Sequence, residues 1–503
     1  MTPLHDLRSH CERLLSRVVA NLGSSEDRSA GLGTPAFSAP DAPGLSGYDV
    51  VREEIALRDG GHVRLVYVRT LIEVGRLWHE VVLPLATGRA DLATLVGAEP
   101  VPDAITVTRR LLAGHVALWG GPGGPTRTVN LSAQIGRPVG EATTESAVSG
   151  PKAAFVERLE TNISLIRGSL RDPALRVEVV IVGRRSRTEV ALCYVDDIIR
   201  RELLDKARAG LEAMDVDIVR SAADLGSQLY AGTWTPFPLV EQTERPDKVV
   251  DALVSGRLAI LPDGSPFALV APTTFWRFVE DSETRVLGPT AVVFARFMRL
   301  VGLGAATGIA GLYVAATTAT ITILPARLAL AVGASRAGVP YPPLTETLFA
   351  LIIADVLVEA TVQASKQVGT ALTIVGTLII GQMLVQARLA SDLTLVVVAA
   401  SVIGTFLTVS PALSYALRLW KYVLVFAAGL GGLSGWIAGW LILVGHLAGL
   451  ESAGVPYLSP LGPVHLDELW RYGLSPLPPQ NMVRRPRSWR PRDVIRARPE
   501  KTR

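Results

Sequence analysis

The chain has 503 residues, more than one hydrophobic core accommodates, so several domains are expected. Hydrophobic residues make up 49% and charged residues 19%, but the charges gather in the first half, and the second half contains long uncharged runs. The formal net charge of +4 is concentrated in residues 484–503, and no base-reading motif accompanies it, so nucleic acid is not a predicted partner.

Catalytic and cofactor-binding motifs are absent from the sequence. It contains no nucleophile elbow, phosphate-binding loop or dinucleotide-binding pattern, so neither an enzyme nor a cofactor is predicted. The two cysteines, Cys11 and Cys193, lie too far apart to indicate a disulfide framework. The seven histidines show no metal-ligand spacing, so no metal site is predicted.

Residues 1–47 are expected to form a short helix followed by a flexible linker. Charged residues interrupt the apolar positions of Leu4–Leu22, so this stretch lacks the apolar core of a signal peptide. Gly23–Ser46 is rich in Gly, Ser, Ala and Pro, a composition typical of a linker. We therefore expect the large domain that follows to be cytoplasmic.

The region that precedes the apolar runs contains one sequence module twice. The matching pairs are Val63–Ile72 with Val190–Ile199 and Leu111–Trp119 with Leu253–Leu261. In each copy the order is strand, helix and glycine-led strand, with β-branched and aromatic residues alternating in the strands. This repetition predicts two α/β subdomains of related fold, residues 48–150 and 151–285.

Short polar motifs stand out in the second subdomain. Their candidate residues for subunit contact or structural turns are Asn162, Arg167, Gly183, Arg184, Glu244, Arg245, Pro246, Asp247, Asp263 and Gly264. Asp-Gly between apolar strands is a hairpin signal, and Asp247 is placed to cap the helix that follows the proline. A structural turn is the first interpretation of these motifs, and partner contact is the second.

Residues 286–458 are predicted to form an all-α membrane domain with four or five membrane segments. Because a span needs about 20 mostly apolar residues, four uncharged runs are each long enough. They are Leu300–Ala326, Gln367–Ala387, Leu393–Leu417 and Tyr422–Leu450. Residues 459–503 form a basic tail, which is typical of a cytoplasmic segment attracted to anionic membrane lipid.

The number of crossings stays open at this point. A cytoplasmic start and a cytoplasmic tail require an even number, which four spans satisfy, although they place Arg418 and Lys421 outside. A full crossing by the polar segment Leu344–Lys366 would fit the loop charges better but would place the tail outside. A re-entrant or buried amphipathic helix in this segment would keep the even number. Small residues recur between Gly429 and Gly439, a pattern that indicates tight helix contacts.

The polar segment carries three acids, Glu346, Asp355 and Glu359. The last two are four residues apart and share a helix face. Because a carboxylate at membrane depth usually faces protein or a water-filled cavity, these acids are candidates for a cation pore or gate. An interfacial helix with its acids in water is an equal alternative. Only Lys366 lies nearby in the sequence as a positive charge.

A set of segments carries a further resemblance. They are Gly150–Arg167, Val182–Thr188, Thr243–Asp247, Gly256–Phe267, Ile374–Gln382 and Gly454–Tyr457. In this order they resemble the GerA family, the A subunits of bacterial spore germination receptors. The resemblance implies a protein of the spore inner membrane that senses small nutrients with a transporter-like B subunit and a lipoprotein C subunit. It also implies that the subunit oligomerises into an ion channel and triggers ion release.

The sequence departs from the family pattern at several positions. Family members usually have Arg-Glu-Ala followed by Arg and Pro in the polar membrane segment, whereas Val358–Ser365 lacks both arginines and the proline. Ser149 and Thr70 replace a usual arginine and a usual glycine. The alternatives kept open are a dipicolinate-release paralogue of the SpoVAF type, a solute transporter acting alone, and a membrane scaffold that conducts nothing.

Overall fold

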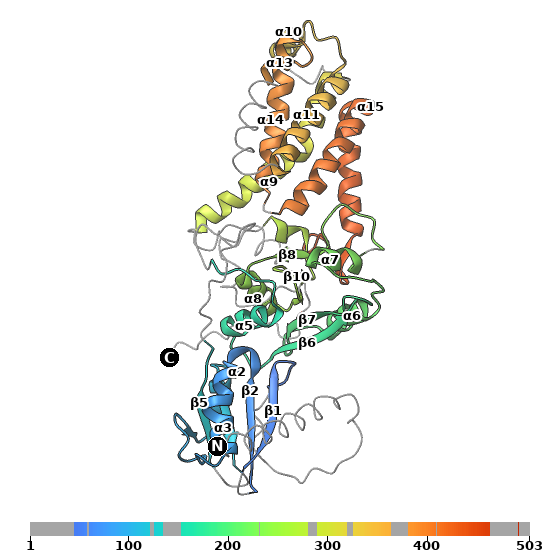
Figure 1. Ribbon diagram of the computed structural model, residues 1–503. Coiled ribbons are helices and arrows are strands. Elements are labelled where there is room, and N and C mark those ends of the chain that lie inside the picture. Colours follow the sequence, from blue (N-terminus) through green and yellow to red (C-terminus); the bar gives the residue numbers. More distant parts are fainter. Residues whose placement is uncertain are drawn as a thin grey trace, which may run out of the picture.

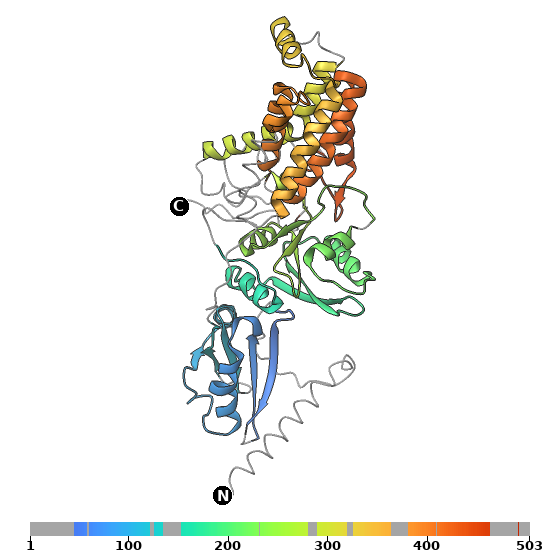
Figure 2. The same ribbon diagram turned by 45° about the horizontal axis from the view of Figure 1, so that its top comes forward.

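The computed structural model describes two antiparallel sheets with their helices, followed by a helical part (Figure 1). The described residues are 45–57, 60–120, 125–133, 152–230, 232–279, 289–318, 325–363, 381–408, 410–462 and 491. The predicted N-terminal helix, the linker and nearly all of the basic tail lie outside them. The first sheet lies at one end of the molecule and the helical part at the other (Figures 1 and 2).

The first sheet has the strand order β1-β2-β4-β5-β3. Its strands are β1 (Val50–Ala56), β2 (His62–Val68), β3 (Glu99–Val101), β4 (His115–Trp119) and β5 (Thr126–Asn130). Alternate residues of β2 point to opposite faces, and both faces are apolar. A stretch made of η1 (Arg69–Leu71), α2 (Val74–Arg76), η2 (Leu77–Val82) and α3 (Leu83–Ala86) follows β2, and its η2 and α3 residues cover one face. Helix α4 (Ala104–Leu111) covers the other.

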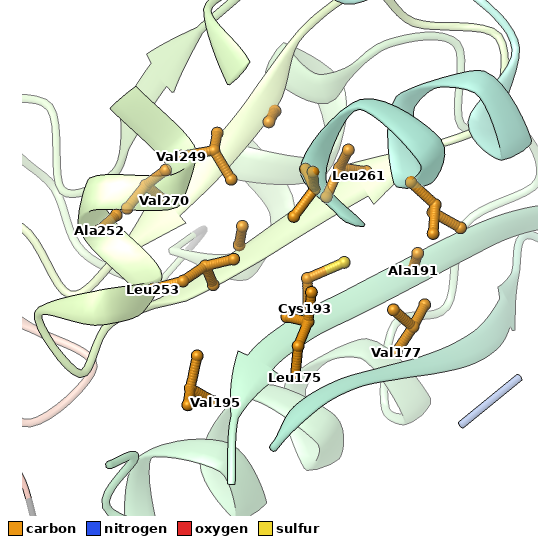
Figure 3. Close-up of a cluster of buried hydrophobic side chains, with 14 of the residues drawn as sticks. Leu175, Val177, Ala191, Cys193, Val195, Val249, Ala252, Leu253, Leu261 and Val270 are labelled. Atoms are coloured by element: carbon orange, nitrogen blue, oxygen red, sulfur yellow. The ribbon is translucent and has the colours of Figure 1, made fainter. Parts of the chain in front are cut away.

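The second sheet repeats this architecture with the order β6-β7-β9-β10-β8. Its strands are β6 (Leu175–Val182), β7 (Thr188–Val195), β8 (Glu241–Thr243), β9 (Leu258–Pro262) and β10 (Ala268–Ala271). Helices α5 (Leu159–Ser169) and α8 (Pro246–Val254) cover one face, and α6 (Arg201–Glu212) and α7 (Ala222–Leu229) cover the other. Figure 3 shows the core under α8, where Cys193 and Leu253 are buried.

The two sheets place equivalent strands at equivalent positions. Strands β2 and β7, which carry the first matched motif, are second in their sheets, and β4 and β9, which carry the other, are third. A glycine with positive φ precedes each third strand, Gly114 at 85° and Gly256 at 93°, a conformation that few other residues tolerate. The shared topology is the one that the paired motifs predict.

The helical part consists of six described helices. They are α9 (Pro289–Thr318), α10 (Ala326–Ser335), α11 (Pro343–Gln363), α13 (Gly381–Gln386), α14 (Asp392–Phe406) and α15 (Pro411–Gly449). Among the described residues, Thr290–Thr318 and Pro411–Gly449 are long and apolar enough to cross a membrane. Helix α9 packs closely on its neighbours, because a Cβ atom at Gly302 or Gly311 would overlap Leu407 or Trp436.

Helix α15 is a hairpin of two antiparallel arms. At Gly432 the backbone leaves the helical conformation, with φ 58° and ψ −138°. A Cβ atom at Gly435 would lie 2.0 Å from the carbonyl oxygen of Ala427, and one at Gly439 would lie 2.7 Å from Leu424 Cδ2. In a straight helix Ala427 and Gly435 would be about 12 Å apart. We call residues 411–431 the first arm and residues 433–449 the second arm.

Two predicted spans are therefore wrong in their bounds. The run Tyr422–Leu450 contains the reversal at Gly432, which a hydropathy pattern does not register because both arms are apolar. The run Leu393–Leu417 is divided, since α14 ends at Phe406 and α15 begins at Pro411, where a proline suits the first helical position.

The other two predicted spans differ less from the observed helices. Helix α9 begins at Pro289, before the predicted start at Leu300, and includes Arg299, whose Nη1 donates to the carbonyl oxygen of Val279 in the soluble part at 3.5 Å. Of the run Gln367–Ala387, residues 367–380 lie outside the described residues, and α13 covers part of the remainder.

The chain returns to the second subdomain after α15. A short hairpin of β11 (Glu451–Ser452) and β12 (Val455–Pro456) follows the second arm. The Ser452 hydroxyl accepts from Thr273 N–H at 3.0 Å and donates to the Leu239 carbonyl at 2.7 Å. A Cβ atom at Gly256 would lie 3.1 Å from Pro491 Cβ. After α15 the chain thus lies again beside the second subdomain, on the side where it entered the helical part.

Candidate functional site

The three acids of α11 lie in two separate environments. Glu346 is in the first turn of the helix, whereas Asp355 and Glu359 follow further along and face the first arm of α15. The structure therefore brings Asp355 and Glu359 together and leaves Glu346 apart from them.

Glu346 joins four elements of the helical part. Its side chain is fully buried, and Arg336 Nε donates to Oε2 at 3.0 Å. Oε1 accepts from the Ser391 backbone N–H at 2.6 Å and from the Thr394 hydroxyl at 2.7 Å, and Thr394 Oγ1 also lies 3.0 Å from the Tyr313 hydroxyl. Because every carboxylate oxygen is engaged, this arrangement is a structural tie between α9, α10, α11 and α14.

Asp355 is held by two residues of the first arm. Lys421 Nζ lies 3.1 and 3.0 Å from its two carboxylate oxygens, and the Tyr422 hydroxyl donates to Oδ2 at 2.6 Å. The Lys421 side chain is only 2% exposed. A lysine buried in an apolar helix requires such a partner, because an isolated charge there is costly.

Glu359 forms a second, looser pair one turn away. Its Oε2 lies 3.8 Å from Arg418 Nη1 and accepts from the Tyr415 hydroxyl at 3.4 Å. The side chain of Glu359 remains 44% exposed. We call the two ion pairs, Asp355–Lys421 and Glu359–Arg418, the charged ladder.

The three acids have more positive neighbours than the sequence predicts. The acids are not left with Lys366 as their only positive neighbour, since Arg336, Lys421 and Arg418 pair with them. The missed cations come from helices distant in sequence. The spacing of the charges is the sequence signal for the ladder. Arg418 and Lys421 are three residues apart between apolar runs, and Asp355 and Glu359 are four apart, so each pair shares one helix face.

The first arm also contacts the soluble domain. Phe237, Phe275 and Tyr457 form an apolar cluster with residues from the domain-side ends of both arms. The arm residues that share this cluster are Leu413, Ala416, Leu417, Leu443 and Leu447. Phe237 lies 6.5 Å from Trp420 and 6.1 Å from His446, measured between ring centroids. One helical element thus carries both the cations of the ladder and the junction with the soluble domain.

Arg167 ties the two subdomains together. It is fully buried and binds Asp49 through two hydrogen bonds, Nε to Oδ2 at 2.8 Å and Nη2 to Oδ1 at 2.9 Å. Nη1 donates to the Leu175 carbonyl at 2.9 Å. Asp49 immediately precedes β1, so this pair spans the boundary between the subdomains. No sequence signal marked Asp49, because its partner lies far along the chain.

Other motif residues converge on the segment that leads into α5. Asn162 accepts from Val156 N–H at 2.8 Å and donates to the Val156 carbonyl at 2.6 Å. Asp263 accepts from Leu159 N–H at 3.0 Å. The backbones of Glu244 and Gly264 hydrogen-bond to Phe155 and Glu157, both at 2.8 Å. Gly264 also supplies the positive φ, 80°, of the β9–β10 turn. These contacts hold the motif residues together within one chain.

The remaining motif residues form local contacts. Asp247 does not cap α8, since it lies inside the first turn of the helix and accepts from Arg245 Nη2 at 2.9 Å. Pro246 occupies the start of α8 instead, where its missing N–H leaves no helical bond unmade. Gly183, with φ 92°, begins the β6–β7 turn, and exposed Arg184 donates to Asp215 at 2.6 Å.

A partly buried acid of β8, Glu241, lies near the junction. Burial disfavours the charged form of Glu241, but Arg277 and Arg257 together more than offset this and hold its pKa at about 2. Arg257 Nη1 donates to Glu241 Oε2 at 2.7 Å. Burial raises the pKa of the Cys193 thiol to about 12, so this cysteine is an inert core residue.

Other potential sites are few in the part of the chain that the structure describes. No group of three or more His, Cys, Asp or Glu side chains there is placed to hold a metal ion. A polar cavity of about 650 Å³ lies along β6, where Tyr48, Arg176, Tyr194 and Arg208 line it. Its charged groups include the Glu178–Arg208 ion pair at 2.6 Å, so it is a solvated groove between paired side chains.

These features define a class of protein: a duplicated α/β domain joined to a helical part with apolar spans and paired buried charges. The sequence matches the family described as Bacillus/Clostridium GerA spore germination protein over residues 46–488. The chain belongs to this family.

Named relatives cover most of the chain. Spore germination protein KA of Bacillus subtilis (strain 168) is 32% identical over 83% of this chain and 79% of that protein. Spore germination protein GerQA of Bacillus cereus is 30% identical over 90% of this chain and 92% of that protein. A solved structure, the N-terminal domain of the A subunit of the Bacillus megaterium spore germinant receptor GerK3, is 24% identical. It covers 46% of this chain and 90% of that one, with a TM-score of 0.34.

Proposed function

We propose that this chain is the A subunit of a spore germinant receptor, which responds to small nutrients and triggers ion release as an oligomeric ion channel. Membership of the GerA family supports the role in germination. The observation that carries the ion-release part is the charged ladder. It holds two carboxylates of α11 within a helical part that has apolar spans, and their counter-charges come from a different helix.

The ladder suits a gate because each ion pair joins two helices and would separate if the helices moved apart. In the closed arrangement each carboxylate is neutralised by a cation of the first arm. Movement of the arm away from α11 would expose the acids and leave a negative lining that attracts cations. A carboxylate or lysine facing hydrocarbon costs about 2.5–3.5 kcal/mol, so the separated groups require water or a neighbouring subunit. That requirement favours a path formed in a homo-oligomer.

The soluble domain is connected to this gate through α15. The cluster around Phe237 packs on the base of both arms, and Lys421 lies four positions after Leu417, about one helical turn. A shift of the second subdomain would therefore be transmitted to the ladder through a rigid element. We infer that nutrient binding in the complex acts on α15 by this route.

The proposed setting follows the family resemblance. The chain works in the spore inner membrane, in contact with membrane lipid, together with a transporter-like B subunit and a lipoprotein C subunit. The soluble domain and the chain end after α15 lie on the cytoplasmic side. The basic residues 484–503 support this orientation.

Germination of spores that lack this gene tests the receptor role. Across a panel of nutrients, such spores are expected to lose the response to at least one, and the wild-type gene is expected to restore it. A full response to every nutrient, with slower dipicolinate release alone, would contradict the receptor role and favour the SpoVAF-type alternative.

Substitutions in the ladder test the gate. Asp355→Asn and Glu359→Gln are expected to alter ion release or the nutrient response while protein level and membrane insertion stay near wild type. Glu451→Gln is the matched control, since Glu451 is an exposed acid outside the helices. Unchanged germination and conductance in both ladder variants would contradict a pore or gate role.

A further inference from the structure

A large aromatic side chain is fully exposed beside the junction of the soluble and helical parts. Trp234 is 100% exposed, in the loop between α7 and β8. Its neighbours in the loop, Gly232, Thr233 and Pro236, are exposed and add no large apolar side chain beside the indole. An isolated indole of this kind does not resemble the broad apolar surface of a protein interface.

The loop is held at a defined level of the helical part. The Thr235 hydroxyl lies 2.9 Å from His446 Nε2 on the second arm, and Phe237 packs on the rings of His446 and Trp420. Thr233 N–H donates to the Tyr230 carbonyl at 2.9 Å, which closes the loop on its other side. Trp234 is therefore positioned within one residue of a direct contact with α15.

The contact between Thr235 and His446 lies at one edge of the apolar outer surface of the second arm. On the second arm Leu441, Ile442 and Val444 are 68%, 61% and 50% exposed, and the next residues lead directly to His446. Exposed aliphatic side chains on an apolar helical arm, packed beside the candidate span of α9, are expected to face acyl chains. Thr235 binds this arm at His446, two residues beyond Val444 and on the side of the soluble domain.

We propose that Trp234 is a membrane anchor that inserts its indole into the headgroup–acyl boundary of the bilayer. The indole has an apolar body and a polar N–H, and tryptophan is enriched at this boundary for that reason. The contact would fix the second subdomain to the membrane surface at a point outside the helices. The occupant is phospholipid, recognised by depth and polarity rather than by a specific headgroup.

Site-specific fluorescence in full-length protein tests this proposal. Trp234→Cys and, as the control, Trp78→Cys are each made with Cys11→Ser, while Cys193 remains because it is buried. Trp78 is also exposed, at 52%, but lies in the first subdomain, at the end remote from the helices (Figure 1). Each protein is labelled with a polarity-sensitive fluorophore and reconstituted in phosphatidylethanolamine–phosphatidylglycerol vesicles, with or without phospholipid that carries a nitroxide near its headgroup.

The label at position 234 is expected to emit at shorter wavelength and to lose about half of its emission or more with nitroxide lipid, as a group inserted at the interface would. The label at position 78 is expected to keep its emission. Equal, water-like emission at both positions would overturn the proposal. Shielded emission at position 234 that nitroxide lipid leaves unchanged would also overturn it, because protein rather than lipid would then cover the indole.

Discussion

Replacing Arg167 with methionine is expected to lower the free energy of unfolding by about 3–5 kcal/mol. The substitution leaves Asp49 fully buried without its counter-charge and removes the hydrogen bond to the Leu175 carbonyl. Because this pair spans the boundary between the subdomains, the loss should also loosen one against the other. The measurement is the thermal unfolding of the purified full-length protein in detergent.

Arg64→Met supplies the matched control for this experiment. Arg64 pairs with Glu54 at 2.9 Å, but the two side chains are 42% and 56% exposed, and an exposed pair contributes about 0–1 kcal/mol. Adding Asp49→Leu to Arg167→Met should recover most of the lost stability, since neither position then holds a buried charge without its partner. Equal melting temperatures for Arg167→Met and Arg64→Met would contradict the assignment.

Gly435→Ala is expected to damage the membrane part more than any other single methyl group added to the second arm. The new Cβ would lie 2.0 Å from the carbonyl oxygen of Ala427 on the first arm, and a backbone atom has no alternative rotamer. The arms must separate, at a cost of about 1–3 kcal/mol or more. Protein level in membranes and the melting temperature in detergent should both fall.

The same helix offers a control of identical chemistry. A Cβ atom at Gly445 would meet nothing within 4 Å, so Gly445→Ala removes a helix glycine without a clash. It should be neutral or slightly stabilising, because alanine favours the helix. If both variants kept wild-type levels and melting temperatures, the hairpin at Gly432 would be wrong.

The sequence predicted the parts of the fold that leave a local pattern. The paired motifs at 63–72 and 190–199 identified the repeated module, because alternation and glycine-led turns are readable along one strand. The small residues from Gly429 to Gly439 indicated close helix contacts, and Gly435 and Gly439 do pack on the opposite arm. The reversal itself was missed, since hydropathy is the same in both arms.

Only the acidic residues of the candidate site were predicted from the sequence. Asp355 and Glu359 stood out as acids in an apolar segment, whereas Lys421 and Arg418 read as the flanks of two spans. Their role depends on α11 and the first arm lying side by side, which is a tertiary arrangement. Arg167 was found as a motif residue, but its partner Asp49 had no signal, because the pair forms only when both subdomains are folded.

The central claim is that the Asp355–Lys421 pair controls ion release, and exchange of its two charges tests that claim most directly. Spores that carry Asp355→Lys, Lys421→Asp or both are compared for nutrient-triggered cation release at matched protein levels. Each single variant places like charges together and should lose normal control of release, whereas the double exchange restores the pair and should recover it. Normal release in both single variants, or a double variant as defective as the singles, would contradict the account.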